Sequence, residues 1–291
     1  MIRKGNFMKT ALIVEGGGMK CAYSAGILDK FLDDDIHFDF CIGVSAGAAN
    51  TLSYLAGQHG RNLRFYTEHL SDPRYLSLRS LLRTGNFFGL EYIYGTLTNS
   101  DGKDPIDYDA IMNNPSEFYM PATDAVTGKA TYFSKYDIIR DNYKTIMATC
   151  ALPGFCRPVQ VNHHFYYDGG VADSIPVQFA LDHGCDRLVI ILSNPRDFVK
   201  QPEHYRPVYK RMLHKYPKTI EGIDNRHLNY QASIDLATQL EAKEKALIFA
   251  PSRHLNLGTF SKDLALEQQL YDLGIEDYEK QASQLKHFLR G

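Results

Sequence analysis

Residues 38–55, FDFCIGVSAGAANTLSYL, decide the fold of this 291-residue chain. The segment Phe38–Ile42, apolar except for Asp39, predicts a strand, and the small residues of Ala46–Leu55 are compatible with a helix that begins soon after it. Between the two lies the pentapeptide Gly43-Val44-Ser45-Ala46-Gly47, whose glycines allow the backbone to turn sharply from strand to helix. The pattern predicts that this turn raises the Ser45 side chain into solvent at the edge of a sheet.

The residues before this stretch complete the same pattern. Thr10–Val14 is a short apolar run that predicts a buried strand, and it is followed by Gly16-Gly17-Gly18. From about Met19 to Leu32, apolar residues recur every three or four positions, which predicts a helix. The chain up to Leu55 therefore runs strand, helix, strand, helix, the order typical of a mainly parallel sheet in an α/β protein.

The character of the sequence changes after about residue 199. From residue 56 to the end we expect a hairpin, three further strands and four helices. The hairpin is Phe118–Ala125 with Lys129–Ser134, the strands are His164–Tyr167, Arg187–Leu192 and Ala246–Phe249, and the helices are Tyr136–Cys150, Pro176–His183, Ile220–Lys245 and Lys262–Arg290. We expect one α/β domain over residues 9–199 and a mostly helical C-terminal extension over residues 200–291 packed on it. Residues 71–116 are the candidate for a mobile cover.

Composition and cysteine pattern bound the classes of function. With 44% apolar residues, 23% charged residues and a formal net charge of −2, the chain is ordinary for a soluble protein and has no general attraction to nucleic acid. Its five cysteines are scattered, with no CxxC pair, which argues for reduced thiols and against a zinc site. The sequence has no apolar run long enough for a secretory signal or a membrane span. We therefore expect a cytoplasmic protein with no metal and no nucleic-acid partner.

A basic stretch near the start of the C-terminal extension adds a local expectation. Its five cations are Arg206, Lys210, Arg211, Lys215 and Lys218. Such a cluster gains about 1 kcal/mol per residue near an anionic membrane, so a peripheral membrane contact is one interpretation. A solvated helical face is the other.

The three glycines after the first strand suggest a site for a negative charge. Consecutive glycines can point several backbone N–H groups into one cavity, where they hold the oxyanion that develops during acyl transfer. The alternative is a phosphate cradle for a dinucleotide, but the fingerprint G-x-G-x-x-G would start at Gly16 and end at Cys21, which is not glycine. The sequence has no GxxxxGK[ST] either, so no nucleotide cofactor is expected.

A third motif follows the strand predicted at His164–Tyr167. Asp168-Gly169-Gly170 places a carboxylate at the end of that strand, beside two residues that allow close backbone approach. Alone, such a motif is most often a turn.

The triple glycine, the GxSxG pentapeptide and Asp168-Gly169-Gly170, in this order, together resemble the patatin-like phospholipase family. The segment Ala151-Leu152-Pro153-Gly154 adds a further match, and the resemblance covers about residues 9–195. Two positions depart from the family pattern: Cys21 replaces the usual last glycine of the Gly-rich block, and Lys20 stands where arginine is common.

The resemblance implies a three-layer α/β/α fold and hydrolysis of lipid acyl esters without a cofactor. It makes Ser45 the nucleophile and Asp168 its partner, with no histidine in the mechanism. The backbone of Gly16, Gly17 and Gly18 would form the oxyanion hole. The supporting glycines would be Gly43, Gly47, Gly169 and Gly170.

Two alternatives remain open from the sequence. A Ser–His–Asp esterase fits the chain order of Ser45, Asp168 and His183, but the α/β-hydrolase fold normally places more strands before its serine than this chain has. A non-catalytic lipid-binding protein of the same fold is the second alternative, and Cys21 is its only support.

Overall fold

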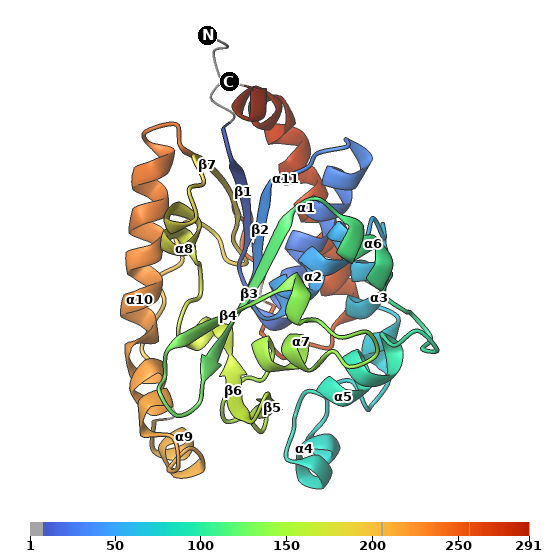
Figure 1. Ribbon diagram of the computed structural model, residues 1–291, viewed down its shortest axis with the longest axis vertical. Helices are drawn as coiled ribbons and strands as arrows, with labels where there is room; N and C mark the ends of the chain where they lie inside the picture. The colour runs from blue at the N-terminus through green and yellow to red at the C-terminus, as the bar shows by residue number, and fades with distance from the viewer. Residues whose placement is uncertain (1–7, 205, 256, 291) are drawn as a thin grey trace.

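The computed structural model describes residues 8–204, 206–255 and 257–290, which form three layers around one central sheet (Figure 1). Within these residues the sheet has eight strands, in the order β5-β6-β3-β2-β1-β7-β8, with β4 paired to β3. The strands are β1 Thr10–Val14, β2 Phe40–Gly43, β3 Glu117–Asp124, β4 Ala130–Ser134, β5 Val159–Val161, β6 His164–Asp168, β7 Arg187–Ile191 and β8 Ala246–Phe249.

The sheet is mainly parallel, as the sequence predicts. Strands β3, β2, β1, β7 and β8 pair in parallel, and β4, β6 and β5 pair antiparallel to their neighbours. In β1, Leu12 lies opposite Cys41 on one side and Val189 on the other. Because parallel strands end at the same edge, the glycines after β1 and the turn after β2 come together there.

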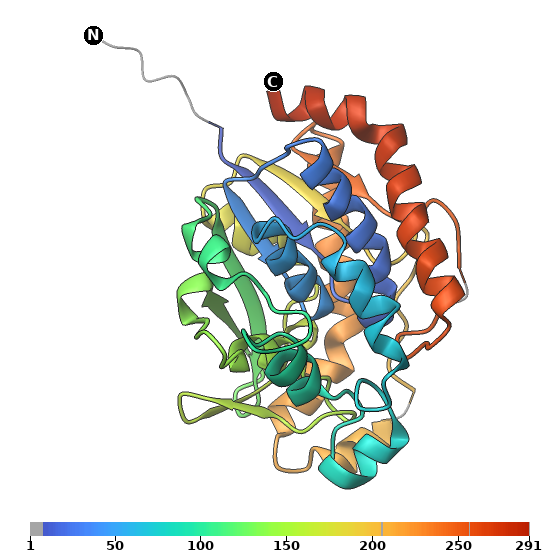
Figure 2. The ribbon, with the colours of Figure 1, turned by 90° about the vertical axis from the view of Figure 1, so that its right-hand side faces the viewer.

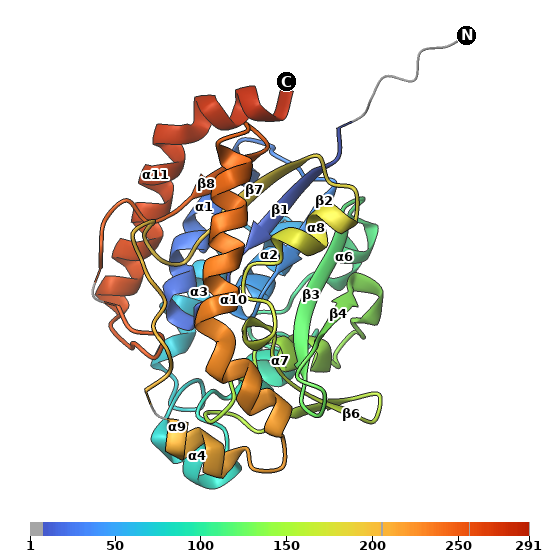
Figure 3. The same ribbon diagram turned by 90° about the vertical axis from the view of Figure 1, so that its left-hand side faces the viewer.

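Helices cover both faces of the sheet because its central strands alternate between two cores. Leu12 and Val14 pack into the core beneath α1, α2 and α11, whereas Ala11 and Ile13 pack into the core beneath α8 and α10 (Figures 1 and 3). The α-helices are α1 Ala22–Asp33, α2 Ala46–Leu55, α3 Arg61–Tyr66, α4 Leu78–Thr84, α5 Leu90–Tyr92, α6 Tyr108–Asn113, α7 Lys144–Thr149, α8 Val177–Asp182, α9 Arg206–Met212, α10 Pro217–Glu241 and α11 Leu264–Arg290. Short 3₁₀ turns span Gly18–Cys21, His69–Ser71, Lys135–Asp137 and Gly169–Val171, and a π-helical turn spans Ile93–Leu97.

The C-terminal residues contribute to all three layers. Strand β8 continues the sheet beside β7, α10 covers one face, and α11 runs along α1 on the other (Figure 2). The α1–α11 contact depends on two glycines, since a Cβ at Gly26 would lie 2.2 Å from the Tyr271 carbonyl oxygen and one at Gly274 would lie 2.2 Å from that of Tyr23. Among the described residues, no helix has both the length and the apolar character needed to cross a bilayer.

Most predicted elements are confirmed, and one prediction is wrong. The helix expected over Tyr136–Cys150 is only a 3₁₀ turn followed by the short α7. Between them, Asp141 has a φ of 57°, and its carboxylate accepts hydrogen bonds of 2.7 Å from both the backbone N–H and the hydroxyl of Ser100. This contact fixes a turn that interrupts the helix. The short strand β5 is not predicted from the sequence.

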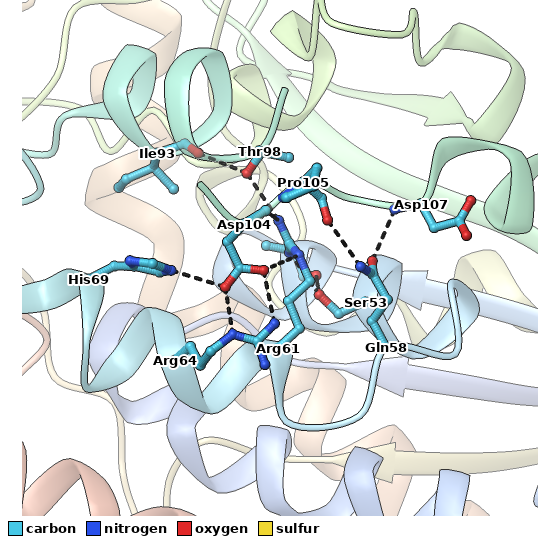
Figure 4. Close-up of polar contacts among 11 residues, drawn as sticks. Ser53, Gln58, Arg61, Arg64, His69, Ile93, Thr98, Asp104, Pro105 and Asp107 are labelled. Atoms are coloured by element: carbon cyan, nitrogen blue, oxygen red, sulfur yellow. Dashed lines mark hydrogen bonds and ion pairs between the residues drawn. The ribbon is translucent and has the colours of Figure 1, made fainter. Parts of the chain in front are cut away.

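A buried ionic network joins α3 to the loop that follows the π-helical turn (Figure 4). The Asp104 carboxylate accepts from Arg64 Nε at 2.7 Å and Nη2 at 2.9 Å, and lies 3.0 Å from His69 Nε2. Arg61 Nε lies 3.5 Å from the same carboxylate, and its Nη atoms donate to Ser53 Oγ and Thr98 Oγ1. Both Arg61 and Asp104 are buried.

The charge of Asp104 is therefore stabilised by its partners. Burial alone would raise its pKa, but the hydrogen bonds from Arg64 and His69 and the charge of Arg61 outweigh burial and hold the pKa below its usual range. A carboxyl with a lowered pKa stabilises the fold above its ordinary pKa, and this stabilisation is lost as the pH falls.

A second buried carboxyl, that of Glu267, has a raised pKa where that of Asp104 is lowered. Glu267, in the first turn of α11, is fully buried, and neither of its carboxyl oxygens has a hydrogen-bond partner among the described residues. Burial, with a smaller contribution from the charge of Asp263, raises the pKa of Glu267 to about 9. The folded state therefore favours the neutral acid, and ionisation of Glu267 opposes the docking of α11.

We expect Asp104→Asn to lower the free energy of unfolding by about 3–5 kcal/mol at pH 7, because it leaves the buried Arg61 charge without its partner. Urea unfolding followed by circular dichroism measures this change. The wild type should lose the Asp104 contribution as the pH falls below about 4, whereas the variant has none to lose. The exposed neighbour Asp101→Asn is the control, and equal stability of the two variants would contradict the role of the network.

We expect Glu267→Gln to protect the fold at alkaline pH. The wild type should become less stable than the variant as the pH rises from about 4.3, the ordinary glutamate pKa, toward the raised pKa of about 9. Melting temperatures at pH 5 and pH 8 measure the difference, which should grow between the two. The exposed Glu279→Gln on the same helix should show no such growth. A pH-independent difference for Glu267→Gln would contradict the buried, unpartnered state.

Candidate active site

Ser45 lies in a strained turn between β2 and α2. Its backbone has a φ of 53°, a left-handed conformation that residues other than glycine rarely adopt. Its N–H donates to Thr149 Oγ1 at 3.1 Å. The turn packs tightly against the end of β1, because a Cβ at Gly47 would lie 2.6 Å from the Val14 carbonyl oxygen. The strand–turn–helix context predicted for the GxSxG motif is therefore present.

Asp168 reaches Ser45 from the end of β6. The Ser45 hydroxyl donates to Asp168 Oδ2 at 2.6 Å, and the Gly170 N–H donates to Oδ1 at 2.8 Å. The backbone of Asp168 is fixed on both sides, because its N–H donates to the Ala151 carbonyl and its own carbonyl accepts from Thr123 Oγ1, each at 2.8 Å. The two carboxylate oxygens and the backbone of Asp168 are therefore all fixed by hydrogen bonds.

The environment of Asp168 makes its carboxylate more basic. Burial raises the pKa of Asp168, and the hydrogen bond from Ser45, the charge of Arg226 and the Gly170 N–H only partly offset that effect. A more basic carboxylate is a better acceptor for the proton of a serine hydroxyl.

The Gly-rich segment after β1 lies directly beside Ser45. A Cβ at Gly16 would lie 2.9 Å from the Ser45 Cβ, so only glycine allows this approach. In the described part of the chain, the backbone N–H groups of Gly16, Gly17 and Gly18 have no hydrogen-bond partner. They are therefore available to a ligand in the cavity that these glycines line with Ser45.

Ser193 and Glu15, which the sequence analysis does not single out, hold the Gly-rich segment in place. Ser193, which follows β7, donates from its hydroxyl to the Gly16 carbonyl at 2.9 Å, and its N–H donates to Glu15 Oε2 at 2.7 Å. No local motif marks Ser193, and only the parallel pairing of β1 with β7 brings it here.

A cavity of about 630 Å³ opens over the three motifs. This volume lies within the usual range for small-molecule sites. The lining includes apolar and aromatic side chains, among them Phe65, Tyr66, Leu90, Ile93 and Tyr94. It also includes polar or charged side chains, among them Lys20, Asn194, Lys200, Glu203 and Arg226. Residues from the predicted cover, 71–116, therefore form part of the wall, and their mobility stays a prediction.

The remaining predicted glycines lie close to the two reacting groups. Gly43 ends β2, two residues before Ser45, and Gly169 and Gly170 begin the 3₁₀ turn after Asp168. Cys21 is fully buried, and its thiol contacts the Glu15 carbonyl oxygen at 3.5 Å. A cysteine is therefore accommodated in the Gly-rich block within the hydrophobic core.

The histidine required by a Ser–His–Asp triad is not near Ser45. His183 follows α8, and its carbonyl accepts from Lys9 Nζ, just before β1. It therefore lies at the edge of the sheet where the parallel strands begin, whereas Ser45 lies where they end. Of the described residues that line the cavity, none is a histidine.

Two family models match parts of the chain. The model of the family described as patatin-like phospholipase matches residues 12–181, more than half of the chain. A second model, described as a domain of unknown function (DUF6363), matches residues 216–290.

Single relatives are more distant. The uncharacterized protein YjjU of Escherichia coli (strain K12) is 28% identical over 204 residues, which cover 68% of this chain and 56% of that protein. The chain thus spans little more than half of that relative's length. The crystal structure of VipD from Legionella pneumophila aligns with a TM-score of 0.47 at 11% identity, covering 94% of this chain and 66% of VipD. On the extent of the first family match, this chain belongs to the patatin-like phospholipase family.

Proposed function

We propose that the protein is a serine hydrolase that cleaves the acyl esters of lipids through a Ser45–Asp168 dyad. The observation that carries the proposal is the 2.6 Å hydrogen bond from the Ser45 hydroxyl to Asp168 Oδ2. Membership of the patatin-like phospholipase family supports lipid esters as the substrate class. The apolar and aromatic residues in the cavity lining support the same class, because an acyl chain requires apolar contacts.

In the proposed reaction, Ser45 Oγ attacks the ester carbonyl carbon while its proton passes to Asp168 Oδ2. The oxyanion that forms accepts hydrogen bonds from the N–H groups of Gly16, Gly17 and Gly18. Removal of one such donor typically costs about 10²–10³ in rate. Collapse of the tetrahedral intermediate breaks the bond to the alcohol, which leaves with the proton held by Asp168. The product is an acyl ester of Ser45.

The second half of the cycle reverses these roles. Asp168 takes a proton from water, the resulting nucleophile attacks the acyl-enzyme, and Ser45 Oγ leaves with that proton. The raised pKa of Asp168 supports both steps, since a carboxyl with an ordinary pKa of about 3.9 is a weak base for either hydroxyl.

The cavity mouth supports a peripheral membrane contact, which we propose as part of this function. Two short helices, α4 and α9, lie at the same end of the molecule (Figures 1 and 3) and both contribute to the cavity lining through Leu81 and Met212. On α4, Leu78 is 70% exposed and Leu82 is 87% exposed. On α9, Val208 and Met212 are also more than half exposed.

Charge at the same place favours an anionic surface. Lys210 and Arg211 are exposed on α9, and Arg83 is exposed on α4. Two other cations of the basic stretch are already paired, Arg206 with Asp224 and Lys218 with Glu221. Exposed apolar side chains beside unpaired basic ones are typical of helices that lie in a membrane interface.

We expect Ser45→Ala to abolish labelling by a fluorophosphonate and Asp168→Asn to lower the hydrolysis of p-nitrophenyl butyrate by about 10²–10⁴-fold, because it removes the general base. The melting temperature of each variant shows whether it is folded. Asp182→Asn, an exposed residue of α8, is the matched control and should keep full activity. Full activity of folded Asp168→Asn would end the dyad proposal. A folded wild type that takes no label would favour the non-catalytic lipid-binding alternative.

We expect the double variant Leu78→Asp, Leu82→Asp to bind phosphatidylglycerol vesicles at least about tenfold more weakly, because a buried leucine side chain contributes ~1.5–3 kcal/mol. Cosedimentation with the vesicles measures binding, and p-nitrophenyl butyrate hydrolysis should stay unchanged. Leu228→Asp, 58% exposed on α10 and outside the cavity lining, is the control. Unchanged vesicle binding by the double variant would contradict a membrane contact through α4.

A further inference from the structure

A cation from the C-terminal region reaches the catalytic turn. Arg226 lies on α10, and its Nε donates to the Gly170 carbonyl oxygen at 2.7 Å. The N–H of the same Gly170 donates to Asp168, so one residue, Gly170, links the guanidinium to the dyad carboxylate. The side chain of Arg226 is 23% exposed and lines the cavity, so it is accessible to a ligand there.

Lys200 also lines the cavity, and its ammonium group lies 5.6 Å from the centroid of the Tyr230 ring. Among the described residues, no hydrogen bond or ion pair to Lys200 Nζ is found, although the residue is only partly exposed. Burial, followed by the charge of Arg226, lowers the pKa of Lys200 to about 8. A bound anion would oppose both effects and stabilise the charged form of Lys200.

The acidic groups nearby offset part of this charge. Glu203 Oε1 forms an ion pair with Arg226 Nη1 at 3.7 Å, a distance beyond that of a hydrogen bond. The carboxylate of Glu15 accepts from the Ser193 N–H, and burial raises its pKa. A third cation, Lys20, also lines the cavity, where it donates to Asn194 Oδ1 at 2.8 Å. These three cations all lie in the lining, and neither Lys200 nor Lys20 has a hydrogen-bonded carboxylate among the described residues.

We propose that Lys200 and Arg226 form an anion subsite that holds the phosphate of a phospholipid while its acyl ester lies at Ser45. The inference rests on the proposed function and adds the residues that would hold the head group. In a glycerophospholipid only a few bonds separate the phosphate from the nearest acyl ester. Arg226 is likewise close to the dyad, because Gly170 is hydrogen-bonded to both Arg226 and Asp168. A neutral glyceride has no charge for this subsite.

The subsite also gives a role to residues 216–290, whose family model carries no assigned function. Helix α10 in this region supplies Arg226, whereas Lys200 precedes α9 and lies outside both family matches. The C-terminal region would then select the head group, while the residues matched by the patatin-like phospholipase model supply the dyad.

Lys200→Gln is the sharpest variant, because the Lys200 ammonium group, which lies 5.6 Å from the centroid of the Tyr230 ring, makes no hydrogen bond to the dyad or to Gly170. Its charge contributes to the pKa of Asp168, so the neutral substrates report any effect on the dyad. We expect its kcat/KM for dioleoyl phosphatidylglycerol in mixed micelles to fall about 10–100-fold, the worth of a charged hydrogen bond. Most of the loss should appear in KM. Hydrolysis of dioleoylglycerol and of p-nitrophenyl butyrate should change less than twofold. Lys200→Arg should retain activity on the phospholipid, and the exposed Lys210→Gln, which does not line the cavity, is the matched control.

Arg226→Gln tests the second cation, with p-nitrophenyl butyrate reporting any disturbance of the dyad through Gly170. A selective loss on the phospholipid supports the subsite. Equal losses on dioleoyl phosphatidylglycerol and dioleoylglycerol, or no loss on the phospholipid for Lys200→Gln, would overturn it.

A binding measurement separates this inference from the proposed activity. In the Ser45→Ala background, calorimetry with short-chain dihexanoyl phosphatidylglycerol should show binding that Lys200→Gln weakens at least about tenfold. Inorganic phosphate is titrated in parallel. Binding of phosphate alone, with no binding of the phospholipid, would overturn the lipid assignment in favour of a free anion. Phospholipid binding that depends on Lys200 in a protein without hydrolase activity would leave the subsite standing and refute only the dyad.

Discussion

Strand β3 sets the position of Asp168 relative to Ser45, and the rest of the site depends on that register. β3 pairs in parallel with β2, where Tyr119 lies opposite Ile42, and antiparallel with β6, where Ala122 lies opposite Asp168. Ala122 is three residues beyond Tyr119, just as Ser45 is three residues beyond Ile42. The two reacting groups therefore stand at the same height, on either side of one strand. A slip of one residue would move Asp168 to the other face of the sheet.

Burial makes the Asp168 carboxylate a stronger base, but it also disfavours the charged form. Neighbouring groups oppose this second effect. Removal of water raises the pKa of Asp168, which favours proton transfer from serine. The hydrogen bond from Ser45, the charge of Arg226 and the Gly170 N–H act in the opposite direction and lower the pKa of Asp168. Because Arg226 belongs to α10, the electrostatics of the dyad depend on a part of the chain far from the motifs that define it.

Sequence reasoning succeeds here where structure is local and is incomplete where it is tertiary. The strand Thr10–Val14 and the helix Ala46–Leu55 are predicted with their observed bounds, because each is fixed by its own apolar pattern and turn residues. The helix predicted over Tyr136–Cys150 fails because Ser100 holds Asp141 in a turn, and nothing within that segment signals the contact.

Much of the cavity lining comes from residues that no local sequence motif reveals. Apolar and aromatic lining residues come from α3, α5 and the π-helical turn, and the cations Lys200 and Arg226 come from the segment after β7 and from α10. An amphipathic ester is favoured when its acyl chain contacts the apolar residues and its charged group contacts the cations. Desolvation penalises a charge placed against aromatic side chains without a partner. The motifs therefore supply the reacting groups, and the tertiary fold supplies the side chains that would orient the ester.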